Sequence, residues 1–236
     1  MFKESCEKNR EAIYGVRGFS QISKKEINNT LGSGFTIAPG ILATVAHLIH
    51  VESNPQNPIH SNFEVIRSPD IGQNMEFASF IAEDPIRDIA LLKINTPRST
   101  KFLTLEANRV PTGSSCGSLG FPLGEIDQTP QSVNISFIER FQGSYISAFH
   151  EENRPSGGIE VYEIDSLMYC GSSGCPGFLI NSNVIGMQSR SLLGKSVVAS
   201  GKRANKNAAP NTQLAISLWV PSMDIITFAR NNGITV

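Results

Sequence analysis

Residues 171–177 read GSSGCPG, a stretch in which two adjacent serines are enclosed by glycines and a proline. Glycine and proline at this density predict a tight turn, because they interrupt both helices and strands. Serine is a weak nucleophile until a neighbouring base removes its proton. The stretch therefore gains chemical meaning only if a histidine and an acid elsewhere in the chain serve Ser172 or Ser173.

Short apolar or alternating runs, separated by Gly, Pro, Asn and Ser, make up most of the remaining sequence. This spacing predicts an all-β barrel or sandwich. Polar stretches at 51–62, 150–158 and 191–212 predict loops. The expected strands are Gly34–Ala38, Ile41–Thr44, Phe63–Arg67, Phe77–Ala82, Ile89–Ile94, Ile135–Ile138, Tyr145–Phe149, Ile159–Ile164, Phe178–Ile180, Val184–Met187 and Leu214–Val220.

The end of the chain breaks this β pattern. Ser222 is suited to cap a helix, Asp224 to stabilise its positively charged first turn, and Gly233 to end it. We therefore expect one C-terminal α-helix of about three turns. The Pro and Gly residues between Thr104 and Gly113 mark the seam between two halves of the chain.

The charge balance argues against two classes of partner. The 236 residues include 20 Lys and Arg and 21 Asp and Glu, for a formal net charge of −1. Such a chain has no electrostatic reason to bind nucleic acid or an anionic membrane. The charged N-terminus lacks the apolar run of a signal peptide, and no segment approaches the roughly 18 apolar residues of a membrane span. We therefore expect a cytoplasmic protein.

The four cysteines, Cys6, Cys116, Cys170 and Cys175, lack the dense spacing of a disulfide framework. We expect them to be reduced thiols. No histidine lies near Cys170 and Cys175 in the sequence, so zinc ligation is not indicated. We expect neither a metal nor an organic cofactor.

A histidine and an acid stand at the ends of predicted strands. His47 follows the run that ends at Thr44, and Asp88 directly precedes the apolar run IALLKI. His47, Asp88 and Ser173 are thus candidates for a base, an orienting acid and a nucleophile.

The same regions hold rival candidates. His50 is an alternative base, and Ser172 is an alternative nucleophile. Asp84 is the other acid, but it precedes a proline and is expected to form a turn. His60 and His150 lie in polar stretches, where we expect them to be solvated.

Three motifs resemble those of the trypsin-like, or chymotrypsin-clan, serine peptidases. ATVAHLIH resembles their histidine motif, DIALLKI their aspartate motif and GSSGCPG their Gly-x-Ser-Gly-x-Pro motif, in the family's order. GFPLG at 120–124, Asp165, VIGMQS at 184–189 and VPSMDIITFARNNG resemble the bacterial Deg/HtrA-like branch. The resemblance covers about residues 12–233, and we expect no PDZ-like module to follow.

This resemblance implies a fold class and a reaction. The fold would be two six-stranded antiparallel β-barrels with a short C-terminal α-helix, residues 1–108 carrying His47 and Asp88 and residues 109–236 carrying Ser173. The activity would be that of a serine endopeptidase acting on proteins or peptides. Ser173 would be the nucleophile because it precedes the motif glycine, and the N–H groups of Gly171 and Ser173 would form the oxyanion hole.

The resemblance also places a substrate pocket. Leu167 and Met168 would lie near its base, and Gln188, Ser189 and Arg190 along one wall, where the substrate backbone pairs as an added strand. An apolar base suggests a medium-sized hydrophobic side chain before the scissile bond. We expect Arg190 to point to solvent, the alternative being a rim position that favours an acidic residue.

Two other functions remain open. One is a catalytically silent module that holds a peptide in the same cleft. The other is a protease effector domain that stays inactive until a partner or sensor orders the loop 166–172. Activation by a newly made N-terminus is not expected, because Ser172 stands where cleavage-activated relatives carry aspartate.

Cys175 replaces a common glycine and is expected to be a small buried side chain, the alternative being a redox role with Cys170.

Overall fold

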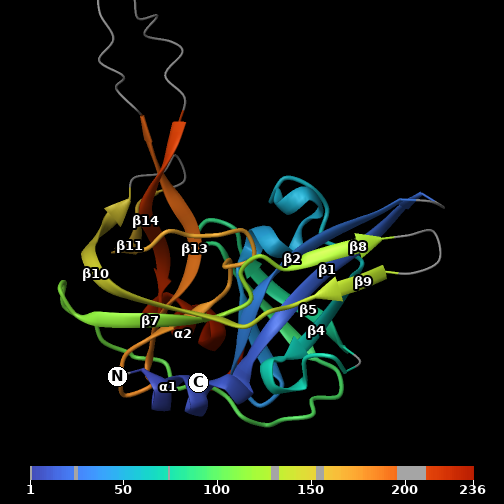
Figure 1. Cartoon of the computed structure of the whole chain (residues 1–236), viewed down its shortest axis with the longest axis horizontal. Helices are drawn as coiled ribbons and strands as arrows, with labels where there is room; N and C mark the ends of the chain where they lie inside the picture. Colours follow the sequence, from blue (N-terminus) through green and yellow to red (C-terminus); the bar gives the residue numbers. More distant parts are fainter. Residues whose placement is uncertain (1, 24–25, 74, 129–132, 153–156, 196–210) are drawn as a thin grey trace, which may run out of the picture.

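The computed structural model describes residues 2–23, 26–73, 75–128, 133–152, 157–195 and 211–236. They form two closed barrels of six antiparallel strands, which lie side by side in Figure 1. The predicted all-β architecture with a short C-terminal helix is confirmed. The strands of the first barrel fall within residues 13–94 and those of the second within 115–221, so the predicted seam lies in the connecting segment.

The first barrel has the strand order β1-β2-β3-β6-β5-β4 and closes through pairing of β1 with β4. Its strands are rich in buried apolar side chains, and Phe35, Leu42 and Leu91 are fully buried. The strands are β1 Ile13–Ser23, β2 Glu26–Ala38, β3 Ile41–Thr44, β4 Asn62–Arg67, β5 Glu76–Asp84 and β6 Ile89–Ile94.

The second barrel has the order β10-β11-β14-β13-β12-β7 and closes through pairing of β7 with β10. Its core holds Trp219, which packs so close to Gly177 that a Cβ there would lie 1.7 Å from the indole ring. The strands are β7 Ser115–Gly120, β10 Arg140–Glu152, β11 Ile159–Ile164, β12 Pro176–Phe178, β13 Val184–Lys195 and β14 Asn211–Pro221.

Shorter elements surround the barrels. A separate two-stranded hairpin is formed by β8 Glu125–Gln128 and β9 Val133–Ser136, both labelled in Figure 1. The helices are α1 Lys3–Asn9 and α2 Ser222–Asn231, and the 3₁₀ turns are Arg10–Ala12, Ala46–Ile49, Val51–Ser53 and Ser68–Asp70. None of the helices in the described part of the chain has the length and apolar character needed to cross a membrane.

Several boundaries differ from the predicted ones. Residues 150–152 extend β10, and residues 191–195 and 211–212 extend β13 and β14, so these parts of the predicted loops are wrong. The reason is that a strand ladder is made of backbone hydrogen bonds, which polar side chains do not prevent: Leu193 pairs with Gln213 and Lys195 with Asn211. The middle of the predicted 191–212 loop, residues 196–210, lies outside the described residues.

The C-terminal helix begins at Ser222 itself, so the predicted capping role of this residue is wrong. Its hydroxyl instead donates to the carbonyl of Glu106, 2.5 Å away, and ties the helix to the segment between the barrels. Asp224 lies in the first turn as expected. Gly233, at φ +76°, follows the helix end in the left-handed conformation that glycine adopts freely.

Candidate active site

His47 and Asp88 are brought together by the pairing of β3 with β6. His47 lies in the 3₁₀ turn that follows β3, and Asp88 directly precedes β6. The Asp88 carboxylate accepts a hydrogen bond from the His47 backbone N–H at 2.9 Å. The second oxygen of this carboxylate, Oδ2, lies 2.9 Å from Nδ1 of the His47 ring. The backbone bond fixes the carboxylate beside His47, and the contact with Nδ1 orients the ring, with the proton on Nδ1 when it donates to the carboxylate.

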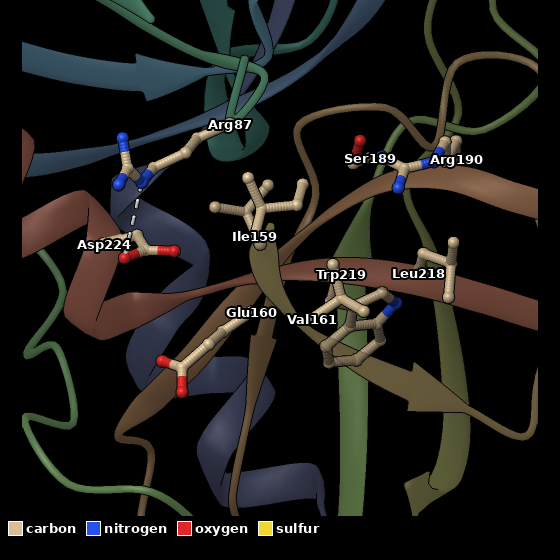
Figure 2. Close-up of a pocket in the computed structure, with 10 residues that line it drawn as sticks. Arg87, Ile159, Glu160, Val161, Ser189, Arg190, Leu218, Trp219 and Asp224 are labelled. Atoms are coloured by element: carbon tan, nitrogen blue, oxygen red, sulfur yellow. Dashed lines mark ion pairs between the residues drawn. The ribbon is translucent and has the colours of Figure 1, made fainter. Parts of the chain in front are cut away.

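Asp88 has a backbone φ of +61°, a conformation uncommon for residues other than glycine. The turn before it is held by Asp84, whose Oδ1 accepts the N–H groups of Ile86 and Arg87 at 3.0 Å. Asp84 is therefore the turn residue that the sequence predicted. Figure 2 shows Arg87 extending from this turn toward Asp224 of α2, with Nε and Oδ1 3.8 Å apart.

The Asp88 carboxylate has a third partner from the second barrel. Ser189 Oγ donates to Asp88 Oδ2 at 2.5 Å, and both residues are buried. Burial raises the pKa of Asp88, but the hydrogen bonds and charge of His47, with the Ser189 hydroxyl, outweigh this and hold the pKa below its usual value. The carboxylate therefore stays ionised behind the imidazole.

Ser173 is the serine that meets the histidine. Its Oγ lies 3.0 Å from Nε2 of His47, across the boundary between the barrels. Ser172 is 2% exposed, and its hydroxyl accepts the backbone N–H of Tyr169 at 3.3 Å. The structure thus brings together His47, Asp88 and Ser173, and it turns the neighbouring serine inward.

The turn before Ser173 leaves one N–H group unused. Ser172 N–H donates to Tyr169 C=O at 3.0 Å, and Gly171 has φ +85°, which defines a type II turn with glycine at its third position. The carbonyl of Cys170 accepts the N–H of Leu123 at 2.6 Å. In a trans peptide the C=O and N–H groups point in opposite directions, so the N–H of Gly171 is directed away from Leu123.

The next peptide is held in the same way. The Ser172 carbonyl accepts the N–H of Cys175 at 2.9 Å, which directs the Ser173 N–H to the other side. Within the described residues, the N–H groups of Gly171 and Ser173 donate to no protein acceptor. Two unused donors beside a serine hydroxyl are suited to stabilise a negative charge that develops on a bound oxygen.

A cavity of about 660 Å³ opens beside Ser173. It includes four of the five predicted pocket residues, Leu167, Met168, Ser189 and Arg190, together with Leu123, which the sequence did not single out. Arg190 forms an ion pair with Glu152 at the end of β10, and its side chain is 31% exposed, so its expected projection into solvent stays a prediction. The full lining is Leu123, Leu167, Met168, Tyr169, Cys170, Ser173, Ser189, Arg190 and Ser191.

Gln188 does not line this cavity. Its side chain is 1% exposed, and Nε2 donates to Ser118 Oγ at 3.1 Å inside the second barrel. It borders a smaller hollow behind the turn that contains Ser172 and Cys175. The side chain of Gln188 therefore points away from the cavity, and the register of β13 shifts between residues 188 and 190, whereas the predicted pairing of this strand with a substrate backbone stays a prediction.

The other histidines and the cysteines differ in their burial. His50 is buried between the Asn57 carbonyl and Glu83. His60 is also buried, so the solvation predicted for His60 is wrong. His150 is exposed and pairs with Glu163. All four cysteines are free thiols. Within the described ranges, no three His, Cys, Asp or Glu side chains are grouped to hold a metal ion.

Cys175 is 2% exposed, as predicted for a small buried side chain. Burial raises the pKa of its thiol to about 11, although hydrogen bonds with Ser33 and Phe121 lower it. The thiolate is therefore disfavoured at neutral pH. Cys170 is exposed and lines the cavity beside Ser173, so the two thiols lie in different environments.

Two antiparallel barrels with a serine, a histidine and an acid meeting at their boundary define a trypsin-like serine protease fold. The model of the trypsin-like peptidase domain matches residues 32–187, and the chain belongs to this family. The family membership predicted from the three motifs is therefore confirmed. Among curated protein sequences, none matches this chain.

Three solved structures show the same fold. The Rv3671c protease of M. tuberculosis in its active form is 17% identical with a TM-score of 0.67, over 98% of this chain and 85% of that one. A serine-to-alanine mutant of the same protein in an inactive form is 16% identical with a TM-score of 0.65, over 97% and 90%. Its unmutated inactive form is 17% identical with a TM-score of 0.64, over 97% and 92%.

Proposed function

We propose that this protein is a serine endopeptidase that hydrolyses peptide bonds through an acyl-enzyme intermediate. The observation that carries the proposal is the line of contacts from the Asp88 carboxylate through the His47 ring to Ser173 Oγ, with two unused N–H donors beside the hydroxyl. A nucleophile, a base and an orienting acid within hydrogen-bond reach are the parts that acyl transfer requires.

In this mechanism His47 Nε2 takes the proton of Ser173 as Oγ attacks the scissile carbonyl. Asp88 stabilises the imidazolium that forms, and the N–H groups of Gly171 and Ser173 hold the tetrahedral oxyanion. His47 then gives the proton to the leaving amine, and the C–N bond breaks to leave an acyl ester on Ser173. Water attacks this ester with the same histidine as base, and the acid product leaves.

The substrate class follows from the cavity. Leu123, Leu167 and Met168 supply an apolar lining, whereas the charge of Arg190 is paired with Glu152. A hydrophobic side chain of medium size before the scissile bond therefore suits the cavity better than an acidic one. We propose protein or peptide substrates, and we expect cleavage after residues such as Leu or Met in a peptide library read by mass spectrometry.

The mechanism is tested by labelling purified protein with a fluorophosphonate probe. Wild type and Ser172→Ala are expected to react, whereas Ser173→Ala is not. Labelling that persists in Ser173→Ala would exclude this nucleophile. A folded wild type that stays unlabelled would contradict the proposal and favour the silent peptide-binding function.

A partner that orders the oxyanion turn is not required by this geometry. The turn is already closed by the bond between Ser172 and Tyr169 and fixed by the bond between Leu123 and Cys170 in the isolated chain. We therefore propose a constitutively competent enzyme. Activity that appears only after addition of a cell extract to purified protein would support the regulated effector instead.

A further inference from the structure

Ser33 is a buried residue of strand β2 in the first barrel, yet it bonds to three residues of the second half of the chain, in two separate segments. Its backbone N–H donates to the carbonyl of Ser173 at 2.8 Å. Its hydroxyl donates to the carbonyl of Gly171 at 3.0 Å and accepts the N–H of Phe121 at 2.9 Å. The first barrel closes through pairing of β1 with β4, so these bonds of Ser33 are not part of its own strand ladder.

These bonds complete the support of the oxyanion turn. The carbonyls of Cys170 and Ser172 are held by Leu123 and Cys175, as described above. The two remaining carbonyls, those of Gly171 and Ser173, are both held by Ser33. Because each peptide is planar, fixing successive carbonyls also fixes the directions of the N–H groups between them.

The surrounding glycines show how closely Ser33 approaches. A Cβ on Gly174 would lie 1.9 Å from the Ser33 carbonyl oxygen, and a Cβ on Gly120 would lie 2.9 Å from the Ser33 hydroxyl. The first glycine belongs to GSSGCPG and the second to GFPLG. Both motifs therefore leave space for one serine of the other barrel to reach the turn.

We propose that the Ser33 hydroxyl is a positioning group for the oxyanion hole, which couples the first barrel to the turn that carries the nucleophile. The proposal rests on the proposed peptidase function. It goes further by assigning the alignment of the Gly171 and Ser173 donors to a residue that does not touch the substrate. The Ser33 hydroxyl would thereby stabilise the transition state more than the bound substrate, because the oxyanion exists only in the transition state and the flanking intermediates.

The kinetic test compares Ser33→Ala with Thr36→Val. Ser33→Ala keeps the N–H bond to Ser173 but removes the hydroxyl bonds to Gly171 and Phe121, together with the contact of the hydroxyl with the Cys175 thiol. Thr36→Val removes a buried hydroxyl of the same strand, which donates to the Lys101 carbonyl away from the cleft. We expect kcat on a peptide substrate to fall roughly 10- to 100-fold in Ser33→Ala with KM changed less than about twofold. Thr36→Val is expected to stay within about twofold of wild type in both constants.

If Ser33 had a purely structural role, its loss would lower the amount of folded enzyme, but the folded fraction would keep the kcat and KM of wild type. Active-site titration of the folded fraction, with thermal unfolding of each variant, separates the two effects. Ser33→Cys, studied under reducing conditions, keeps a similar volume but offers only a weak donor, and it replaces the alanine variant if that variant does not fold. A normal kcat in the folded variant, or a rise in KM that accounts for the whole loss, overturns the proposal.

Hydrogen exchange provides a second readout that does not depend on activity. In a Ser173→Ala background, adding Ser33→Ala is expected to speed exchange about tenfold in the segments 119–123 and 169–175, whereas adding Thr36→Val is not. Unchanged exchange in both segments contradicts the positioning role. If wild type hydrolyses no peptide and takes no fluorophosphonate, the proposed function fails, and this exchange comparison still decides whether Ser33 positions the turn.

Discussion

Ser189 Oγ donates a 2.5 Å hydrogen bond to Asp88 Oδ2, so the acid of the first barrel is held by a hydroxyl of the second. The two residues are 101 positions apart in the sequence. Together with the 3.0 Å contact between His47 and Ser173, this bond joins the barrels on both sides of the imidazole. The relative position of the barrels therefore determines the geometry of the whole site.

Replacing Ser189 by alanine is expected to lower kcat about tenfold, because a hydrogen bond to a charged group is worth about 1.5–3 kcal/mol and part of it orients the carboxylate. Steady-state kinetics with a peptide substrate measures the change. Ser144→Ala is the matched control, since it removes a buried hydroxyl that has no partner in the described structure. Equal effects of the two substitutions would show that the Ser189 bond does not support catalysis.

Gly171→Ala is expected to lower kcat about a hundredfold or more, comparable to the loss of one oxyanion donor. Its φ is +85°, and a Cβ would lie 2.7 Å from the carbonyl oxygen of Phe121, so the peptide must rotate. Gly113→Ala is the control, because Gly113 has φ +86° and open space around it. We expect Gly113→Ala to keep full activity and to lose only about 1–2 kcal/mol of unfolding free energy. Equal kcat values in the two variants would contradict the assignment of the Gly171 donor.

Iodoacetamide is expected to modify Cys170 before the other cysteines of the folded protein. Cys170 is exposed, whereas burial raises the pKa of the Cys116 thiol to about 12 and that of Cys175 to about 11. The adduct would fill the cavity beside Ser173 and reduce peptide hydrolysis, and Cys170→Ser should resist this inhibition. Peptide mapping identifies the modified thiol. Equal labelling of Cys175 in folded protein would show that its burial does not protect it.

Stability is expected to fall on acidification through His60. Burial, with the nearby charge of His50, lowers the pKa of His60 to about 4 from an ordinary value of about 6.5. The unfolded chain therefore binds the proton first, and the contribution of His60 is complete above pH 6.5 and is lost as pH falls toward 4. Urea unfolding of wild type should show a loss of about 3 kcal/mol from this group between pH 7 and 4.

His60→Asn is the matched variant, because asparagine does not titrate in this range. Its unfolding free energy should depend on pH less steeply by the same amount over that window. Parallel pH profiles of wild type and variant would mean that His60 is not held neutral in the folded protein.

Much of the β-structure was predictable because short apolar or alternating runs between turn residues mark strands. Strand β6, with its run IALLKI, and strand β3 were expected at the bounds that the structure has. Strand β7, with the sequence SCGSLG, carries no such pattern. Its small residues are buried all the same, because neighbouring strands cover them. The N-terminal helix α1 was likewise not foreseen.

The sequence by itself determined the order and spacing of the histidine, aspartate and serine motifs, and it singled out Ser173 through the glycine that follows it. It also marked the glycines on which the turn depends. Only the tertiary structure decided what each neighbouring side chain does: Ser189 bonds to Asp88, Gln188 points into the barrel, and Ser33 supports the oxyanion turn. These contacts join segments that lie far apart in the chain, and strand register together with barrel packing, rather than any local pattern, sets which side chains meet.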